Sequence, residues 1–308
     1  MIKCKAKADV QEMIIGFKDE NKLLYHYTKM CVAKDHILKS GTLLLGSFGN
    51  MNDPKESKIW EFNLGTNQNR DLGRYNQFEL SKRLSDALKN NAWLVCFCRD
   101  SGPLTGNHLQ DIAKRGYAKP RMWAQYAEKH TGVCLVFDRE LLGKQIERSC
   151  SHTFAIYAGN VTYRDRLVVP NLHEGDYFIN VDYLEEFGFE EYVRAHLRTY
   201  HRRLFFEKMQ DWRDEKEFRW VVFSDNSGQI RVNIADSLVG VIFGDSANEQ
   251  EVEEIIQILL PTKVQMMGIR WHNCSPWYDY ASLKYDRNAR NSPWFRKNPE
   301  SDNEGKRP

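Results

Sequence analysis

Two carboxylates and a guanidinium alternate where a charged segment becomes an apolar one. They belong to Glu215, Glu217 and Arg219, and the segment continues through residues 220–223, Trp-Val-Val-Phe. Because successive side chains of a β-strand point to opposite faces, a strand through this segment places all three charged groups on one face. Burying charged groups at the start of an apolar strand costs free energy unless the charges are paired or serve a functional site. The pattern therefore predicts either a functional charge cluster or a solvated edge with ordinary ion pairs.

Three other groups of residues are compatible with ligand binding, and each also has a structural explanation. His26 lies between two tyrosines in an expected strand, where a histidine is more often a satisfied core residue than a ligand-binding group. Residues 52–54, Asn-Asp-Pro, can form an Asx–Pro turn. Trp123 and Tyr126 are three residues apart on an expected helix, a spacing that usually indicates core packing. None of these signals is specific alone.

The composition narrows the class of protein. A chain of 308 residues with 42% hydrophobic and 28% charged residues is expected to be soluble and globular. Seven cysteines, an odd number that lies mostly within apolar runs, favour free thiols in a reducing cytosol over a disulfide framework. Cys96 and Cys98 have no second cysteine pair nearby, so we expect no zinc site and no other metal site. No apolar run approaches the length of a membrane span, and we expect a cytoplasmic protein.

Strands and unlike helices alternate irregularly along the chain, which predicts an α+β fold. Residues 93–98 and 133–137 are apolar almost throughout and therefore predict central strands. Residues 181–208 predict a long charged helix. Further expected elements are a helix near 10–17, a strand at 22–28, helices at 29–39, 78–90 and 120–130, strands at 157–163 and 238–243, and a helix opened by the capping-box residues Ser246 and Glu249.

The chain shows neither an internal repeat nor a long low-complexity linker, so we expect one domain with helical insertions over residues 1–270. Residues 271–308 mix aromatic with basic side chains and predict a C-terminal tail whose end, residues 298–308, is disordered. Residues 194–203 also interleave cations with rings, the combination that grips single-stranded nucleic acid. The alternative is a solvated helix face and a tail packed on the core, since a net charge of +2 attracts nucleic acid only weakly.

Taken in order, the motifs resemble a large bacterial and phage family of unknown function, over residues 22 to 244. The matching positions are residues 24–28 (Leu-Tyr-His-Tyr-Thr), 52–54 with Glu56, 95–97, 122–126 (Met-Trp-Ala-Gln-Tyr), 130–132, 137–138, Lys208, Trp212, Glu215, Glu217, Arg219 and 241–244. One departure is Cys98, because the family often has serine after the Cys-Phe pair.

That family in turn resembles the ADP-ribosyltransferase superfamily. The strand with His-Tyr-Thr, followed by a helix and Gly41, is similar to the NAD-binding start of the DNA-targeting ADP-ribosyltransferase toxins. The Glu-x-Glu pattern at 215–217 resembles the superfamily's catalytic glutamate strand. The resemblance implies an ADP-ribosyltransferase-like mixed β-sheet core with helical insertions, and NAD as cofactor. Some relatives act in toxin–antitoxin or phage-defence loci, where nucleic acid is a target class.

The resemblance also implies the roles of the charged residues. Cleavage of the nicotinamide–ribose bond passes through a state with positive charge on the ribose, as glycoside cleavage does. Glu217 is the expected catalytic carboxylate that stabilises this charge and holds the 2′-hydroxyl. Glu215 would bind the acceptor and orient or deprotonate it, and Arg219 would hold Glu217 or a phosphate.

The cofactor would be held by residues of the earlier motifs. His26, expected to be both catalytic and cofactor-binding, would hydrogen-bond the adenosine ribose, and Thr28 would line the same cleft. Tyr126, or alternatively Tyr27, offers a flat face for nicotinamide, and Trp123 belongs to the same set.

The segment at residues 52–54 completes the predicted site, because Asn52 and Asp53 would lie on a loop over the cofactor. The sequence therefore predicts a cytoplasmic NAD-dependent ADP-ribosyltransferase, a toxin or phage-defence effector that modifies nucleic acid, with RNA slightly ahead of DNA, and that can have an antitoxin protein as a partner. One alternative is a nucleotide-binding or sensor module of the same fold without turnover. Another is a nuclease toxin that uses His26 and the carboxylates.

Overall fold

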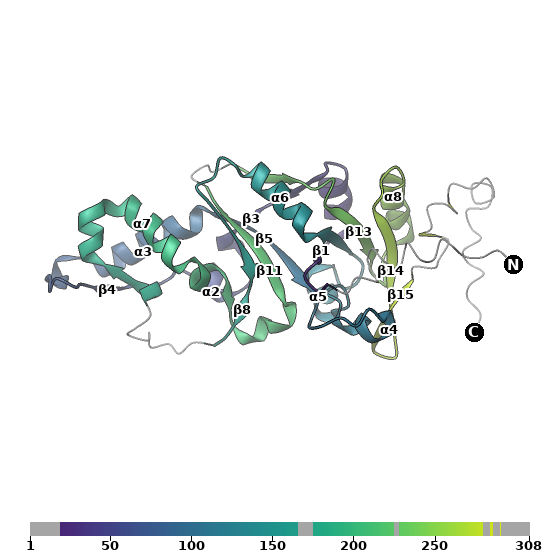
Figure 1. Ribbon diagram of the computed structural model, residues 1–308, viewed down its shortest axis with the longest axis horizontal. Coiled ribbons are helices and arrows are strands. Elements are labelled where there is room, and N and C mark those ends of the chain that lie inside the picture. Colours follow the sequence, from purple (N-terminus) through teal and green to yellow (C-terminus); the bar gives the residue numbers. More distant parts are fainter. Residues whose placement is uncertain (1–18, 166–174, 225–227, 280–283, 286–289, 291–308) are drawn as a thin grey trace. The chain divides into compact units, whose positions relative to one another are not determined.

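The computed structural model describes residues 19–165, 175–224, 228–279, 284–285 and 290. The chain divides into two compact units (Figure 1), each formed from separate stretches of sequence. The first unit consists of Met1–Leu43, Phe97–Ser149 and Arg231–Pro308, and the second of Leu44–Cys96 and Cys150–Ile230. The helix expected near 10–17 and the disorder expected at 298–308 lie outside the described residues. The single domain expected over residues 1–270 stays a prediction.

Two strands are divided between the units along the chain, β2 (Thr42–Leu44) and β5 (Ala92–Arg99). Strands and helices of different types occur in both units, so the fold is α+β, as the irregular alternation along the sequence predicts.

The first unit is built on a mixed β-sheet with the strand order β15-β14-β13-β6-β1-β5. Strands β13 and β14 are parallel and helix α8 connects them, whereas the other neighbours are antiparallel. Strand β6 is buried at all six positions because it has a strand on each side, which confirms the predicted central strand at 133–137. Apart from β5, the strands are β1 (Leu23–Thr28), β6 (Val133–Asp138), β13 (Leu238–Phe243), β14 (Gln265–His272) and β15 (Ser275–Asp279), with a short β12 (Arg231–Asn233) outside this sheet.

Several helices of the first unit differ from the sequence predictions. Helix α5 begins at Pro120 as predicted but ends at Tyr126, because Glu128, Lys129 and His130 all have positive φ angles of 51°, 55° and 74°. Helix α8 begins after Asn248 rather than Ser246, since the Asn248 side chain accepts the N–H groups of the first turn. The helices are η2 (Val32–Leu38), a π-helix, α4 (His108–Asp111), η5 (Ile112–Lys114), α5 (Pro120–Tyr126), α6 (Arg139–Ser149) and α8 (Glu249–Leu259).

In the second unit, strand β11 lies between β5 and β7, and β3 pairs with the start of β5. All seven residues of β11 are buried. The remaining pairs, β4 with β9 and β8 with β10, are parallel and short. The strands are β3 (Gly46–Ser47), β4 (Asn63–Gly65), β7 (Ala155–Asn160), β8 (Thr162–Tyr163), β9 (Phe178–Asn180), β10 (Glu207–Lys208) and β11 (Glu217–Phe223).

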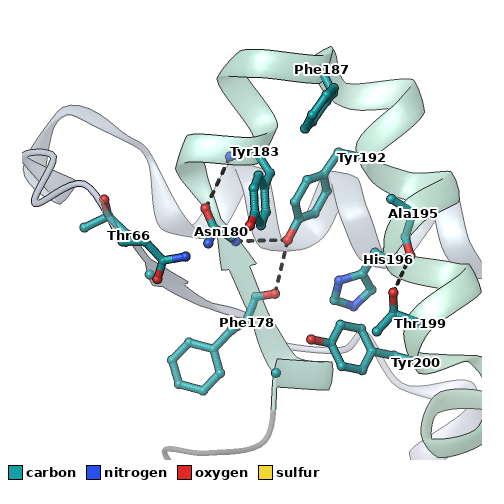
Figure 2. A pocket seen from close by; sticks show the side chains of 13 residues that line it. Thr66, Phe178, Asn180, Tyr183, Phe187, Tyr192, Ala195, His196, Thr199 and Tyr200 are labelled. Carbon is teal, nitrogen blue, oxygen red and sulfur yellow. Dashed lines mark hydrogen bonds between the residues drawn. The ribbon is translucent and has the colours of Figure 1, made fainter.

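The longest helix of the second unit is broken near its start. Helix α7 spans Val181–Phe205, but Gly188 has φ 76° and ψ 169°, so two helical pieces meet at an angle there. A pocket lies beside this helix and strand β9 (Figure 2). The other helices are η3 (Phe48–Asn50), α2 (Pro54–Ser57), η4 (Leu72–Arg74), α3 (Gln77–Asn90), η6 (Gly175–Tyr177) and η7 (Gln210–Glu215).

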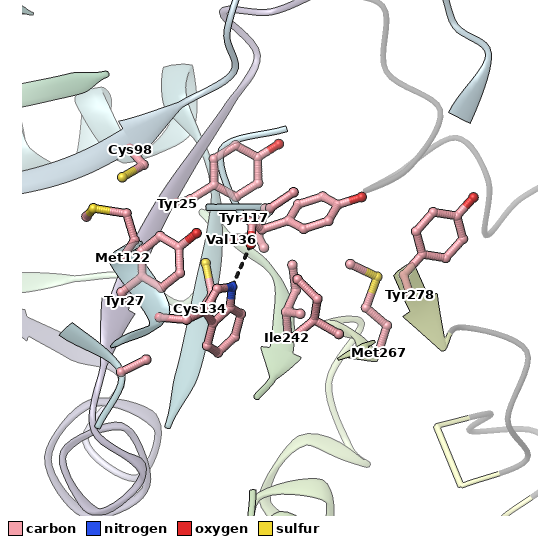
Figure 3. Close-up of a cluster of buried hydrophobic side chains, with 14 of the residues drawn as sticks. Tyr25, Tyr27, Cys98, Tyr117, Met122, Cys134, Val136, Ile242, Met267 and Tyr278 are labelled. Carbon is pink, nitrogen blue, oxygen red and sulfur yellow. Dashed lines mark hydrogen bonds between the residues drawn. The ribbon is translucent and has the colours of Figure 1, made fainter. Parts of the chain in front are cut away.

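Each unit has its own hydrophobic core. In the first unit, residues of β1, α5, β6 and β13 pack together (Figure 3), and Tyr25, Trp123 and Cys134 are completely buried. In the second unit, the core joins α3 and α7 to β11, with Phe205 and Phe223 in edge-on contact at 4.9 Å between ring centroids. Among the residues that the structure describes, we find no helix with the length and apolarity needed to cross a membrane.

Candidate functional site

The charged residues that open strand β11 form a buried cluster within the second unit. The strand begins at Glu217, not at Glu215, because Lys216 takes a left-handed conformation with φ 47° and ends the 3-10 helix η7. The single face predicted for a strand through Glu215, Glu217 and Arg219 is therefore wrong for Glu215. A lysine on β10 nevertheless connects the carboxylates, because Lys208 Nζ lies 2.9 Å from Glu215 Oε2 and 2.8 Å from Glu217 Oε2.

Arg219 is the centre of this cluster and has no exposed surface. Its Nε lies 2.6 Å from Glu217 Oε1, and its Nη2 lies 2.9 Å from Glu217 Oε2, so the pair is bidentate. Its Nη1 donates to Glu56 Oε1 at 2.5 Å and to the carbonyl oxygen of Phe205, the last residue of α7, at 2.9 Å. One guanidinium thus connects strand β11, helix α2 and the end of helix α7.

The two carboxylates that share Arg219 have pKa values shifted in opposite directions. Burial raises the pKa of Glu217, but Arg219 and Lys208 outweigh burial and hold this pKa well below its ordinary value, with a further hydrogen bond from Cys96. At Glu56, burial dominates over the same two cations and raises the pKa. Two carboxylates whose pKa values differ in this way can have different roles: one stays an anion, and the other can carry a proton.

The cluster holds three carboxylates and two cations. Burial lowers the pKa of Lys208, but Glu217 and Glu56 outweigh it, so the pKa lies above its ordinary value and the ammonium stays charged. Protonation of Glu56 would remove one negative charge from this cluster.

Helix α2 positions Glu56. Asp53 caps the helix, with its Oδ1 accepting the N–H of Lys55 at 2.9 Å, and Pro54 occupies the first helical position. Lys89 donates to the carbonyl oxygen of Glu56 at 2.8 Å. Two buried acceptor atoms of this segment, Asp53 Oδ2 and Glu56 Oε2, have no hydrogen-bond partner among the described residues. Asn52, the preceding residue, is exposed.

The remaining predicted site residues lie in the first unit. His26 is half-buried on β1, with its ring 5.6 Å from that of Phe97. Thr28 is buried at the end of the same strand. Tyr126 is half-buried at the end of α5. Their contacts with NAD stay predictions.

Tyr27 and Trp123 are core residues of the first unit. The Tyr27 hydroxyl donates to the carbonyl oxygen of Gly116 at 2.7 Å, and the Trp123 Nε1 donates to that of Tyr117 at 2.7 Å. Their rings meet edge-on at 5.2 Å. The cofactor roles expected for these two residues also stay predictions.

The basic run at residues 194–203 is engaged within the second unit. Its four arginines contact side chains there: Arg194 lies over the ring of Phe154, Arg198 pairs with Glu191, Arg202 lies over Phe206 and Arg203 pairs with Asp176. These contacts agree with a solvated, ion-paired helix face. They do not support the predicted binding of nucleic acid by this run, which stays a prediction.

Three residues in or beside the cluster have no role predicted from the sequence. Lys208 and Glu56 are among the positions that match the family motifs, and nothing else in the sequence indicates that they belong to a site. Cys96, expected to be a core residue, is half-buried and packs against the core of the second unit, and its thiol also hydrogen-bonds Glu217. Within the described part of the chain, we find no three His, Cys, Asp or Glu side chains placed to share a metal ion.

Part of the chain matches the model of a known family. A family described as protein of unknown function (DUF2971) matches residues 122–220. The match agrees with the resemblance to a family of unknown function, and it includes Trp123, Tyr126, Glu215, Glu217 and Arg219. Neither a curated protein nor a solved structure matches the chain.

Proposed function

We propose that the protein is an NAD-dependent ADP-ribosyltransferase with an ADP-ribosyltransferase-like fold, and that it acts as a toxin or phage-defence effector on nucleic acid, with RNA ahead of DNA. The observation that supports this proposal is the buried cluster in which Arg219 and Lys208 keep Glu217 anionic. A fixed carboxylate of this kind can stabilise positive charge on a ribose while its glycosidic bond breaks.

The segment before and within helix α2 fits the ribose of a dinucleotide. A buried acceptor without a donor costs about 1–3 kcal/mol, and sugar hydroxyls are donors. The free acceptors of Asp53 and Glu56 therefore suit ribose hydroxyl groups. His26, Thr28 and Tyr126 keep the cofactor roles that the resemblance implies.

NAD, when bound, supplies the ADP-ribosyl group and a nicotinamide–ribose bond whose cleavage places positive charge on the ribose. Glu217 would stabilise that charge, with Arg219 fixing the orientation of its carboxylate. The nucleic-acid acceptor atom loses a proton as it bonds to the ribose. Either Glu215 or Glu56 would take this proton, and the raised pKa of Glu56 brings it closer to the value that a general base needs near neutral pH.

A second candidate is a nucleotide-binding or sensor module of the same fold without turnover. This alternative is favoured by the burial of Glu217, which is 3% exposed, and by the engagement of both its carboxylate oxygens. An arrangement of this kind also serves to stabilise a protein interior without any chemistry.

Label transfer tests the proposal. Purified protein is incubated with labelled NAD and, separately, single-stranded RNA, single-stranded DNA and a protein mixture. Glu217→Gln should lower transfer at least about a hundredfold, because the charge that stabilises the ribose is lost. Glu190→Gln is the matched control, since Glu190 is an exposed glutamate of α7 outside the cluster. Thermal unfolding of each variant separates lost chemistry from lost folding, and Glu56→Gln replaces Glu217→Gln if the latter does not fold.

Each outcome decides between the candidates. Transfer that persists in folded Glu217→Gln contradicts the proposal. Binding of NAD without transfer in the unmodified protein supports the sensor module, and strand cleavage without NAD supports a nuclease. A transferase effector should also be toxic on expression, with Glu217→Gln relieving the toxicity.

A further inference from the structure

A second candidate site lies in the second unit and shares no lining residue with the charge cluster. It is a pocket of about 630 Å³ beside strand β9 and helix α7 (Figure 2). This volume is in the range of sites for small molecules. Neither the function proposed above nor the family match gives this pocket a role.

The break at Gly188 gives the pocket its shape. The first piece of α7 carries Tyr183 and Phe187, and the second piece carries Tyr192, His196 and further residues as far as position 200. Because the helix changes direction between these pieces, both can face the same space. The break thus converts one helix into two walls of a pocket.

The lining is aromatic and uncharged. Besides rings from both pieces of α7, it includes Phe178 of β9, and the described lining residues include no lysine, arginine, aspartate or glutamate. Tyr183 and Phe187 are 51% and 56% exposed, and their ring centroids are 6.2 Å apart. Neighbouring exposed rings are unfavourable in water and typical of a surface that contacts a ligand. A flat, uncharged ligand suits such walls.

Polar atoms of the pocket provide both a donor and an acceptor. His196 is 5% exposed, and its Nε2 donates to the carbonyl oxygen of Asp176 at 3.1 Å, which leaves Nδ1 as an acceptor. Burial lowers the pKa of His196 to about 4, so the ring is neutral at pH 7. Asn180 uses its Oδ1 to cap α7, and its amide nitrogen has no hydrogen-bond partner in the described part of the chain. Figure 2 shows the ring of His196 between those of Tyr192 and Tyr200.

We infer that this pocket binds a nucleobase, stacked on the rings of Tyr183 and Phe187 and hydrogen-bonded at its edge by His196 and Asn180. A nucleobase is planar and neutral and carries donors and acceptors on one edge, which matches the lining. The base can belong to a free nucleoside or nucleotide or to a single strand. The described lining residues offer aromatic rings and polar atoms rather than cations, so they suit the base rather than its phosphate. This inference is independent of transferase activity.

Calorimetric titration of the full chain tests the site. The probes are adenosine, guanosine, cytidine and uridine, their 5′-monophosphates, and a short single-stranded RNA with an abasic version of it. Phe187→Ala and Tyr183→Ala should each weaken binding roughly tenfold, because the loss of one base–ring stacking contact lowers the affinity by about that factor. Phe78→Ala is the matched control, because Phe78 is a 76% exposed phenylalanine of the second unit that does not line the pocket.

The salt dependence gives an independent readout. Affinity for nucleosides should stay nearly constant between about 50 and 200 mM salt, and the 5′-phosphate should add little, whereas phosphate-driven binding falls steeply. Binding of nucleosides identifies a free ligand, and binding only of the strand, lost in its abasic version, identifies a base within nucleic acid. The inference would be overturned if no probe binds, or if Phe187→Ala and Tyr183→Ala both bind as tightly as the unmodified protein. A steep salt dependence of the affinity would also overturn it.

Discussion

Replacement of Arg219 by lysine tests the charge cluster most directly. The guanidinium makes four hydrogen bonds from three nitrogens, two to Glu217, one to Glu56 and one to the carbonyl oxygen of Phe205. A lysine ammonium keeps the charge but donates from a single point, so it cannot reproduce the bidentate pair and also reach the other two acceptors. At least two charged hydrogen bonds are lost.

The expected cost follows from the number of lost bonds. Hydrogen bonds to charged groups contribute about 1.5–3 kcal/mol each, so the loss of two such bonds costs about 3–6 kcal/mol. The free energy of unfolding of Arg219→Lys should therefore be lower than that of the unmodified protein by about this amount. Urea unfolding at pH 7, followed by fluorescence and circular dichroism, measures this difference.

The control makes the same substitution at an exposed pair. Arg198 pairs with Glu191 on helix α7, and the two side chains are 64% and 50% exposed. Exposed pairs contribute about 0–1 kcal/mol, so Arg198→Lys should be nearly neutral. A cost below about 1 kcal/mol for Arg219→Lys would refute the argument that this guanidinium holds α2, α7 and β11 together.

Two further predictions concern a buried histidine and a close backbone approach. Burial lowers the pKa of His196 from 6.5 to about 4, so the unfolded chain takes up a proton between these values that the folded chain does not. The contribution of His196 to the free energy of unfolding should be fully present above about pH 6.5 and should fall by up to about 3 kcal/mol toward pH 4. In acid unfolding curves, His196→Gln should remove this contribution, whereas His152→Gln, at an exposed position, should keep it. At Gly244, a Cβ would lie 2.0 Å from the carbonyl oxygen of His130, so Gly244→Ala should lower the melting temperature through a cost of about 1–3 kcal/mol. A Cβ at Gly49 meets nothing within 4 Å, and a comparable loss in Gly49→Ala would contradict this steric explanation.

The strands were the most predictable part of the fold. Apolar runs such as residues 133–137 can form only buried segments, and β6 is indeed central in its sheet. Helix α5 shows the limit of such reasoning. Glu128, Lys129 and His130 ordinarily favour right-handed conformations, so the sequence predicts a helix through His130. The left-handed turn also makes contacts that form only in the fold, the bonds from Ser246 N–H to the carbonyl oxygen of His130 at 3.1 Å and from Gly244 N–H to that of Gly132 at 3.0 Å.

The candidate site was predictable only where its residues are neighbours in sequence. The alternation of Glu217 and Arg219 was visible because they are two positions apart. Glu56, 163 positions from Arg219, belongs to the same cluster, and no local pattern indicates a pairing over that separation. The nucleobase pocket had no sequence signal, since it depends on the conformation of one glycine within an otherwise continuous helix.

Substitution of Gly188 alone should therefore be enough to alter ligand binding in the pocket. Its φ of 76° with ψ of 169° is a combination that is essentially restricted to glycine, although a methyl group there would meet no neighbouring atom. Any other residue would favour an unbroken helix for conformational reasons alone, and straightening would redirect the aromatic rings that precede it. A single codon change could thus abolish the pocket in a descendant protein while every residue of its lining stays the same.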